Sequence, residues 1–176
     1  MIIGNKKTGI RVLTASAMMA ALSIILERVF SLMPASNMLD FRISLSNVPI
    51  ILAGIIVSPI SGALCGVVSD IVGCFISGYA PFPILTVAPL IMGFLPGFIL
   101  GKMRNNPYYS FFKVLCVIVI SHFFASVLVT TYGLCIMRGV GFIPMLITRL
   151  WSCLANIVID TSLVYLLLKT NLAKKI

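Results

Sequence analysis

Acidic residues, and charged residues in general, are scarce in this sequence. Its 176 residues include only four acids, and charged residues make up 10% of the chain, whereas 60% of it is hydrophobic. Soluble domains contain roughly 25% charged and about 45–50% apolar residues. A chain of this size cannot hide such an apolar surplus in one core, because small domains keep much of their surface in water. The composition therefore excludes a soluble globule and predicts that the protein lies in a lipid bilayer.

Residues for catalysis and metal binding are also scarce. The single histidine, His122, excludes a multi-histidine metal site, and the five cysteines include no C-x-x-C pair, so we expect them to be small buried apolar side chains. The chain has no glycine-rich phosphate loop and cannot hydrolyse a nucleotide by itself. The four acids are spread over three predicted helices and a loop, without a catalytic motif. We predict no catalytic residue, no metal and no cofactor.

The apolar residues form runs long enough to cross a membrane, for which a helix needs about 20 residues. The runs are continuous rather than alternating, which excludes membrane strands. The first run is too long for a cleavable signal peptide, and no A-x-A-like site follows it. We predict an all-α integral membrane protein, a six-transmembrane-helix bundle forming one domain over residues 1–176, with helices at about 10–33, 45–57 (short), 60–77, 84–101, 111–135 and 142–169.

The basic residues fall into two groups. Nine of the 13 cations, including every lysine, flank the predicted helices on the side of both chain ends: Lys6, Lys7, Arg11, Lys102, Arg104, Lys113, Lys169, Lys174 and Lys175. By the positive-inside rule both termini are expected in the cytoplasm. The other four, Arg28, Arg42, Arg138 and Arg149, are arginines near the opposite side. The formal charge of +9 would indicate nucleic acid in a soluble protein, but here it predicts orientation and an outer group of arginines.

Small residues recur every fourth position in three predicted helices. They are Gly93, Gly97 and Gly101, then Gly62 and Gly66, and in the first helix Ala17 and Ala21. Such spacing permits close contact between helix backbones in a membrane. The glycines therefore predict tight packing inside the bundle, and the alanine pair predicts packing inside it or against a partner.

Polar residues inside the predicted helices are candidates for function, because charges within a membrane are costly. Arg149, Cys153, Asn156 and Asp160 recur at i, i+4, i+7 and i+11, a polar stripe that should face the bundle interior. His122, Ser126 and Thr130 share another face, on which we expect His122 to make a hydrogen bond between helices. Structural pairing is the alternative for the arginines: Arg28 with Asp40, Arg149 with Asp160 or Asp70, and Arg42 extended toward the membrane surface.

The outer arginines favour an anionic ligand, because guanidinium groups bind carboxylates through two parallel hydrogen bonds. Four aromatic residues, Tyr79, Phe82, Tyr132 and Trp151, are placed to rim the same side. They could instead form the aromatic belt common at membrane interfaces. The pattern predicts an outward-facing cavity for an anion that carries a flat ring.

Two segments resemble a known family. RISLSNVPIILAG over residues 42–54 and GALCGVVSDIVG over residues 62–73 resemble the helix 2 and helix 3 motifs of the substrate-binding S components of energy-coupling-factor (ECF) vitamin transporters, particularly the folate branch. The resemblance extends over roughly the whole chain.

The resemblance implies a six-helix subunit of a bacterial plasma-membrane transporter that captures a vitamin from outside under a lid of two loops, 34–44 and 78–86. It implies as partners a transmembrane coupling subunit, which would dock on Ala17 and Ala21, and two cytoplasmic ATPase subunits, with no nucleic acid. We expect folate to bind at Arg28, Arg42, Asn47, Tyr79, Phe82, Thr86, Arg149 and Trp151.

Alternatives remain open at this stage. Residues 80–88, APFPILTVA, differ from the longer Phe-Pro-Gly-Phe-Thr-Leu-Ser-like run of the folate branch, so the vitamin could be riboflavin, pantothenate, thiamine or a similar one. A ligand-free assembly subunit is a further possibility. This chain lacks the clustered acids or the nucleophile–base pair that a membrane enzyme would need. It also lacks the inverted repeat found in many secondary transporters, which argues against a self-sufficient carrier.

Overall fold

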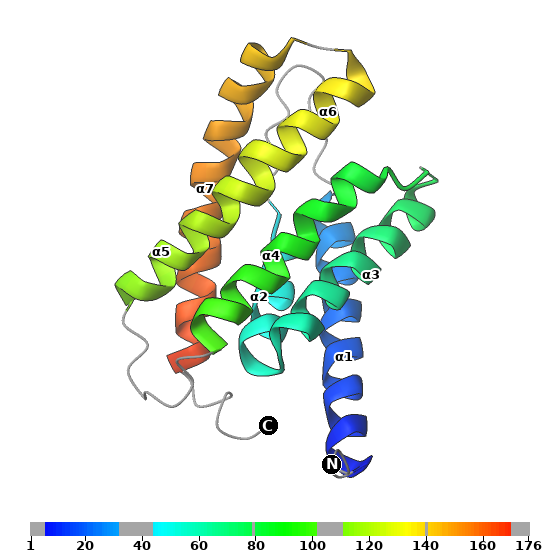
Figure 1. The fold of residues 1–176 in the computed structure, drawn as a ribbon, viewed down its shortest axis with the longest axis vertical. Coiled ribbons are helices and arrows are strands. Elements are labelled where there is room, and N and C mark those ends of the chain that lie inside the picture. Colours follow the sequence, from blue (N-terminus) through cyan, green and yellow to red (C-terminus); the bar gives the residue numbers. More distant parts are fainter. Residues whose placement is uncertain (1–5, 32–43, 79, 102–110, 140, 170–176) are drawn as a thin grey trace.

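The protein is a bundle of helices, seen in a computed structural model that describes residues 6–31, 44–78, 80–101, 111–139 and 141–169 (Figure 1). The elements are α1 (Lys6–Ser31), α2 (Asn47–Ile56), α3 (Pro59–Ser77), α4 (Pro83–Gly101), α5 (Phe111–His122), the π-helical segment η1 (Phe123–Thr130), α6 (Thr131–Arg138) and α7 (Phe142–Lys169). No strand occurs in these ranges. The predicted all-α architecture is confirmed, and α5, η1 and α6 together form the fifth predicted helix, three residues longer than expected.

Five of the six predicted helices are long and apolar enough to cross a membrane: α1, α3, α4, the continuous helix α5–η1–α6, and α7. The exception is α2, whose 10 residues extend only about 15 Å at 1.5 Å per residue, against a hydrocarbon thickness of about 30 Å. Among the described residues, six helices are thus present as predicted; five are long enough to span the membrane, and the sixth, α2, is short and mostly buried.

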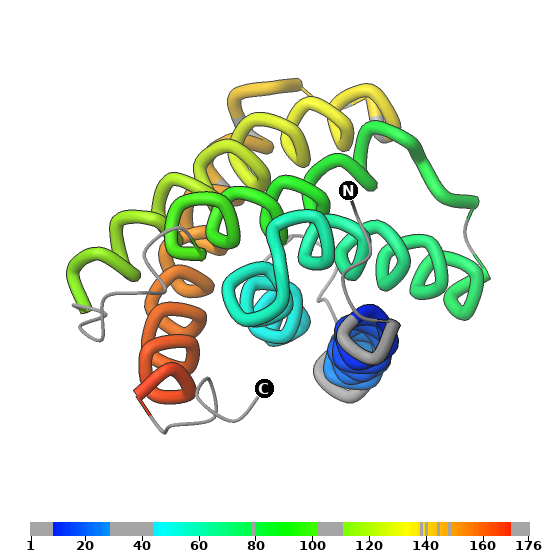
Figure 2. The backbone as a smooth tube through the Cα atoms, turned by 60° about the horizontal axis from the view of Figure 1, so that its bottom comes forward, coloured from blue at the N-terminus to red at the C-terminus, as the bar shows by residue number. Residues whose placement is uncertain are grey.

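The helices form two groups that meet at α4. Helix α4 packs against α2 and α3 on one side and against η1 and α5 on the other, while α7 packs against α5 and η1. Helix α1 lies at the edge of the bundle, where it contacts α2 and α3 (Figure 2). In Figure 1, α1 begins and α7 ends at the lower end of the bundle. This arrangement leaves much of α1 uncovered.

Glycines bring the backbones of α2, α3 and α4 into direct contact. A methyl group added at Gly97 would lie 2.6 Å from the carbonyl oxygen of Gly54, and one added at Gly62 would lie 2.6 Å from that of Gly93. Gly66 meets the backbone of Pro89 in the same way, whereas an added methyl at Gly101 has nothing within 4 Å. The predicted close packing is confirmed for four of the five glycines, and Gly101 takes no part in it.

The turn between α2 and α3 and the end of α3 have defined caps. The hydroxyl oxygen of Ser58 accepts a hydrogen bond from the N–H of Ser61 at 3.1 Å, and Pro59 follows at the first helical position, where its missing N–H has no helical partner to lose. Helix α3 ends at Gly78, whose φ of 73° is a left-handed conformation that glycine adopts without a steric penalty. These ends place Asp70 about two turns inside α3.

A packed apolar layer closes one half of the bundle. It joins α2, α4, α5 and α7 through Val48, Ile51, Leu52, Ile55, Leu100, Val114, Val117, Ile118, Val164 and Leu168. Ile51, Ile118 and Val164 are fully buried, at 0% exposure. This cluster, called here the apolar floor, lies next to the polar residues described below.

The helix from Phe111 to Arg138 changes to π-helical geometry in its middle. Within it, the Thr130 hydroxyl donates to the carbonyl of Ala125 at 2.9 Å, five residues earlier. Segments of π-helix are rare and occur frequently at functional sites. The π-helical segment η1 faces α4 and α7, and three of its residues line the cavity described next.

Candidate functional site

A cavity of about 250 Å³ lies between the two helix groups, a little below the roughly 300–1,000 Å³ typical of ligand pockets. Residues from both groups line it: Glu27, Ser44, Ser46, Asn47, Ile50, Ser69, Asp70, Leu85, Ala88, Pro89, Met92, His122, Ala125, Ser126, Thr130, Leu134, Arg149, Ser152 and Asn156. The mixture of apolar side chains with a few charged and hydrogen-bonding groups is typical of a small-molecule site.

A hydrogen-bonded triad of Asn47, His122 and Asp160 lies at the base of the cavity. His122 Nε2 lies 2.8 Å from Asp160 Oδ2, and the Asn47 amide nitrogen donates to the same oxygen at 3.3 Å. His122 and Asp160 are buried, at 2% and 0% side-chain exposure. His122 and Asn47 line the cavity, while Asp160 lies behind them. The predicted interhelical hydrogen bond of His122 is therefore confirmed, with Asp160 of α7 as its partner.

The charged lining residues lie on opposite walls. Glu27 of α1 and Asp70 of α3 line one side, where the hydroxyl of Thr86 donates to Asp70 Oδ2 at 2.8 Å. Arg149 of α7 lines the other, seven residues into its helix and thus about 10 Å from its start. The cavity therefore offers acceptors on one wall and a guanidinium on the other.

Asn156 fixes the backbone near the start of α2. Its amide oxygen accepts the N–H of Ser44 at 2.8 Å, and its amide nitrogen donates to the carbonyl of Ser152 at 2.8 Å. The hydroxyl of Ser23 reaches across from α1 to the carbonyl of Ser46 at 2.9 Å. These bonds join α1, α2 and α7 at the level of the cavity.

Both polar patterns of the sequence are found at the cavity. Arg149 and Asn156 line it, and Cys153 and Asp160 of the same stripe are buried. His122, Ser126 and Thr130 also line it together. The expectation that these faces point into the bundle is confirmed.

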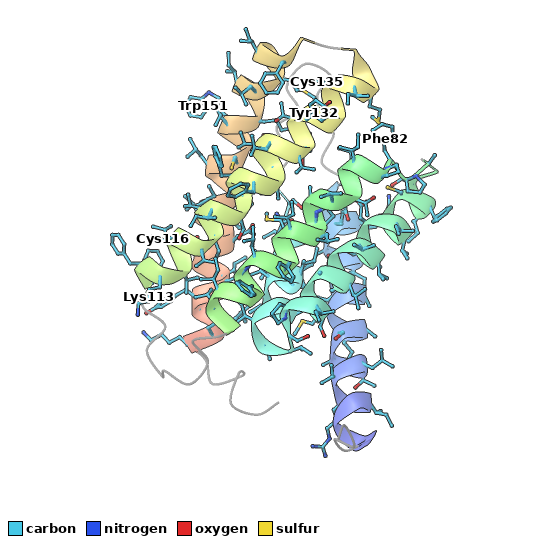
Figure 3. The ribbon with its side chains drawn as sticks, viewed as in Figure 1. Phe82, Lys113, Cys116, Tyr132, Cys135 and Trp151 are labelled. Carbon is cyan, nitrogen blue, oxygen red and sulfur yellow. The ribbon has the colours of Figure 1, made fainter. Side chains whose placement is uncertain are left out.

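The eight predicted binding residues do not all meet at the cavity. Asn47 and Arg149 line it, and Thr86 supports Asp70 from behind. Phe82 is half-buried before α4 and is not part of the lining, and Trp151 is 67% exposed on the outer surface of α7 (Figure 3). Arg42 and Tyr79 fall outside the described residues.

Arg28 bonds to the end of α3, while its predicted partner Asp40 lies outside the described residues. Its guanidinium donates to the carbonyl of Gly73 and, at 2.6 Å, to the hydroxyl of Ser77. Both acceptors belong to the last turns of α3, and Arg28 is not among the residues that line the cavity. In this structure Arg28 connects the end of α1 to the end of α3.

The lining therefore differs in charge from the predicted arginine-rich, aromatic-rimmed cavity. Its described residues comprise one arginine, two carboxylates and no phenylalanine, tyrosine or tryptophan. Sequence reasoning placed no binding role on Glu27, Asp70 or His122. For His122 a signal was present, because it shares a helix face with Ser126 and Thr130; for Glu27 the sequence offered none.

The predicted docking pair lies on the uncovered part of α1. Ala17 and Ala21 are both exposed, and only 11% of the membrane-spanning part of α1 is buried inside the protein, the lowest share of the five spans. The face is thus accessible to a lipid or to a neighbouring protein.

One family model matches the sequence, and one solved structure has a similar fold. The sequence model described as the substrate-specific component of ECF transporters matches residues 11–170. Among solved structures, the fold is similar to one described as the crystal structure of FolT bound with folic acid, with a TM-score of 0.68, 20% sequence identity and 93% of each chain covered. No curated protein matches the sequence. Because the family match spans nearly the whole chain, the protein belongs to the substrate-specific components of ECF transporters, which are membrane subunits that bind a transported substrate and are not enzymes.

Proposed function

We propose that the cavity binds folate, and that the chain is the high-affinity binding subunit of an ATP-driven vitamin uptake transporter. The observation that carries the proposal is Arg149 on one wall of a cavity with a hydrogen-bonding base, in a fold similar to that of a protein with folic acid bound. Folate has the matching chemistry, with carboxylates at its glutamate end and a flat, hydrogen-bonding pterin ring at the other.

In this proposal Arg149 binds a glutamate carboxylate of the vitamin. A guanidinium binds a carboxylate through two parallel hydrogen bonds, which fixes orientation as well as affinity. Arg42, with Tyr79 and Phe82 of the predicted lid, remains proposed as an outer contact, whereas Trp151 and Arg28 are left out of the site because neither lines the cavity.

A cationic vitamin such as thiamine is a second candidate, and one observation favours it. Glu27 and Asp70 both line the cavity, so its described charged groups sum to about −1. Two carboxylates in the lining would stabilise a positively charged ring better than they would an anion. The two candidates differ in charge and are separated by one titration.

The proposed partners are a transmembrane coupling subunit and two cytoplasmic ATPase subunits. The chain has no nucleotide-binding loop of its own, and α1 presents exposed small residues, Ala17 and Ala21, for close helix contact. The lysines near both chain ends support an orientation with these ends in the cytoplasm of a bacterial cell.

The test is calorimetric titration of the purified, detergent-solubilised chain with folate, thiamine, riboflavin and pantothenate. Sub-micromolar binding of folate alone supports the proposal. Tight binding of thiamine without folate assigns the carboxylate wall to a cation instead. If none of these vitamins binds or raises the melting temperature, the chain is a ligand-free assembly subunit and the proposal is wrong.

A further inference from the structure

The triad of Asn47, His122 and Asp160 is the deepest polar layer of the cavity. Each member lies four residues, about one helical turn, from a fully buried apolar residue of the apolar floor: Asn47 from Ile51, His122 from Ile118, and Asp160 from Val164. Three helices thus change from polar to apolar at the same level. A ligand that enters the cavity meets Asn47 and His122 last.

Asp160 determines which atoms of the triad can serve a ligand. In the state with Asp160 ionised and His122 neutral, the carboxylate only accepts hydrogen bonds, so His122 donates through Nε2 and Asn47 through its amide nitrogen. The neutral imidazole then has Nδ1 as an acceptor, and the amide of Asn47 has its oxygen. Neither atom is bonded to another described residue. In this state the base of the cavity presents two acceptors, with the buried negative charge of Asp160 behind them.

We propose that His122 and Asn47 bind the uncharged heterocyclic end of the ligand by accepting hydrogen bonds from its ring and amino N–H groups, with Asp160 as the residue that positions both. This inference rests on the proposed function and adds to it the orientation of the ligand and the class of ring it carries. A 2-amino-4-oxo-pyrimidine edge, as in a pterin, presents adjacent N–H donors that match two neighbouring acceptors.

The position of Arg149 supports this orientation. Arg149 lies seven residues, about two turns, before Asn156 and eleven before Asp160 on the same helix, which separates the guanidinium from the triad by roughly 16 Å along α7. A ligand with a ring at one end and a carboxylate at the other can meet both groups only with its ring at the base. Charged ends are costly to place there, because Asp160 is fully buried and the apolar floor lies beneath.

His122→Gln is the test variant, because a glutamine amide can still donate to Asp160 but does not replace Nδ1. Binding of folate, of 6-hydroxymethylpterin (the ring without the tail) and of p-aminobenzoyl-glutamate (the tail without the ring) is measured by calorimetry or by competition with folate. We expect the variant to bind the two ring-containing ligands about 10- to 100-fold more weakly, as for the loss of a buried hydrogen bond. Binding of p-aminobenzoyl-glutamate should stay within about twofold.

Controls separate ring recognition from a structural role. Cys116→Ala changes an exposed residue of α5 that does not line the cavity, and its binding of all three ligands should stay within about threefold. Asn47→Ala is the second variant, used if His122→Gln does not fold, with the melting temperature of the ligand-free protein as the check.

The outcomes are distinct. Equal weakening of all three ligands, or unchanged folate binding by both variants, overturns the inference and leaves the proposed function intact. If the wild-type chain binds thiamine and not folate, the same comparison is made with its aminopyrimidine and thiazole fragments, and a loss confined to the aminopyrimidine supports the inference. If the wild-type chain binds no vitamin, both proposals fall.

Discussion

Gly97→Ala tests the glycine contacts on which the α2–α4 packing depends. The added methyl group would lie 2.6 Å from the carbonyl oxygen of Gly54, 2.8 Å from its carbonyl carbon and 2.9 Å from its Cα. All three neighbours are backbone atoms, so no side chain can rotate out of the way. The two helices must therefore separate by roughly 0.8 Å to restore an ordinary contact of 3.4 Å.

The expected cost follows from two opposing terms. Overpacking of a tight site costs about 1–3 kcal/mol, while replacing a helical glycine by alanine returns up to about 1 kcal/mol of helix propensity. The net loss of about 1–2 kcal/mol corresponds to a decrease in melting temperature of roughly 2–8 °C for a chain of this size.

Gly101→Ala is the matched control, because it makes the same substitution in the same helix at a position with nothing within 4 Å. Melting of the purified protein is followed by tryptophan fluorescence in one detergent. Gly101→Ala should melt at or slightly above the wild-type temperature. If Gly97→Ala melts within about 1 °C of Gly101→Ala, the close approach of α2 and α4 is wrong.

Two further predictions concern α1. Arg28→Ala removes hydrogen bonds from a charged donor to Gly73 and Ser77, each worth about 1.5–3 kcal/mol. The melting temperature should therefore decrease by several degrees, while the affinity for folate changes less than about threefold. A large loss of affinity without a loss of stability would return Arg28 to the binding site. Ala17→Trp and Ala21→Trp should abolish co-purification with the coupling subunit and leave folate binding unchanged. The control Met18→Trp, at a neighbouring position that is 74% exposed, should preserve the complex. If all three variants assemble with the coupling subunit, the Ala17–Ala21 face is not the docking surface.

Long-range features of the fold followed from simple sequence patterns. Continuous apolar runs located the five candidate spanning helices, because a helix satisfies all its backbone hydrogen bonds within one segment in lipid. Glycines spaced by four residues located the α3–α4 contact, since only they allow backbones to touch. The helix at 45–57 was predicted to be short, and the structure makes it three residues shorter, from Asn47 to Ile56.

The composition of the site was harder to predict, for geometric reasons. Arg149 and Trp151 are two residues apart, about 200° around a helix, so they could not both face one cavity; a helical projection would have excluded one of them. Glu27 and Arg28 are neighbours about 100° apart, and their sequence position does not say which faces inward. The partner of Arg28 is a backbone carbonyl 45 residues away, which no side-chain pattern reveals.

The π-helical segment was not predictable from hydropathy, because its apolar residues are the same ones that an α-helix would need. A π-helix differs from an α-helix in its i→i+5 hydrogen bonds. Here the hydroxyls of Thr130 and Thr131 also bond to carbonyls five residues earlier. Threonine hydroxyls commonly bond to the preceding turn, so the residue type alone does not mark the change.

The apolar floor has a consequence for the energy balance of the cell. A polar cavity that reaches the middle of a membrane protein shortens the distance over which the membrane potential acts. Each elementary charge that leaks across the membrane dissipates about 2.3 kcal/mol per 100 mV. Ile51, Ile118 and Val164 are fully buried beneath the cavity, and they offer a proton or a sodium ion no polar group to bind. The ligand-free subunit can therefore reside in the membrane without conducting protons or sodium ions.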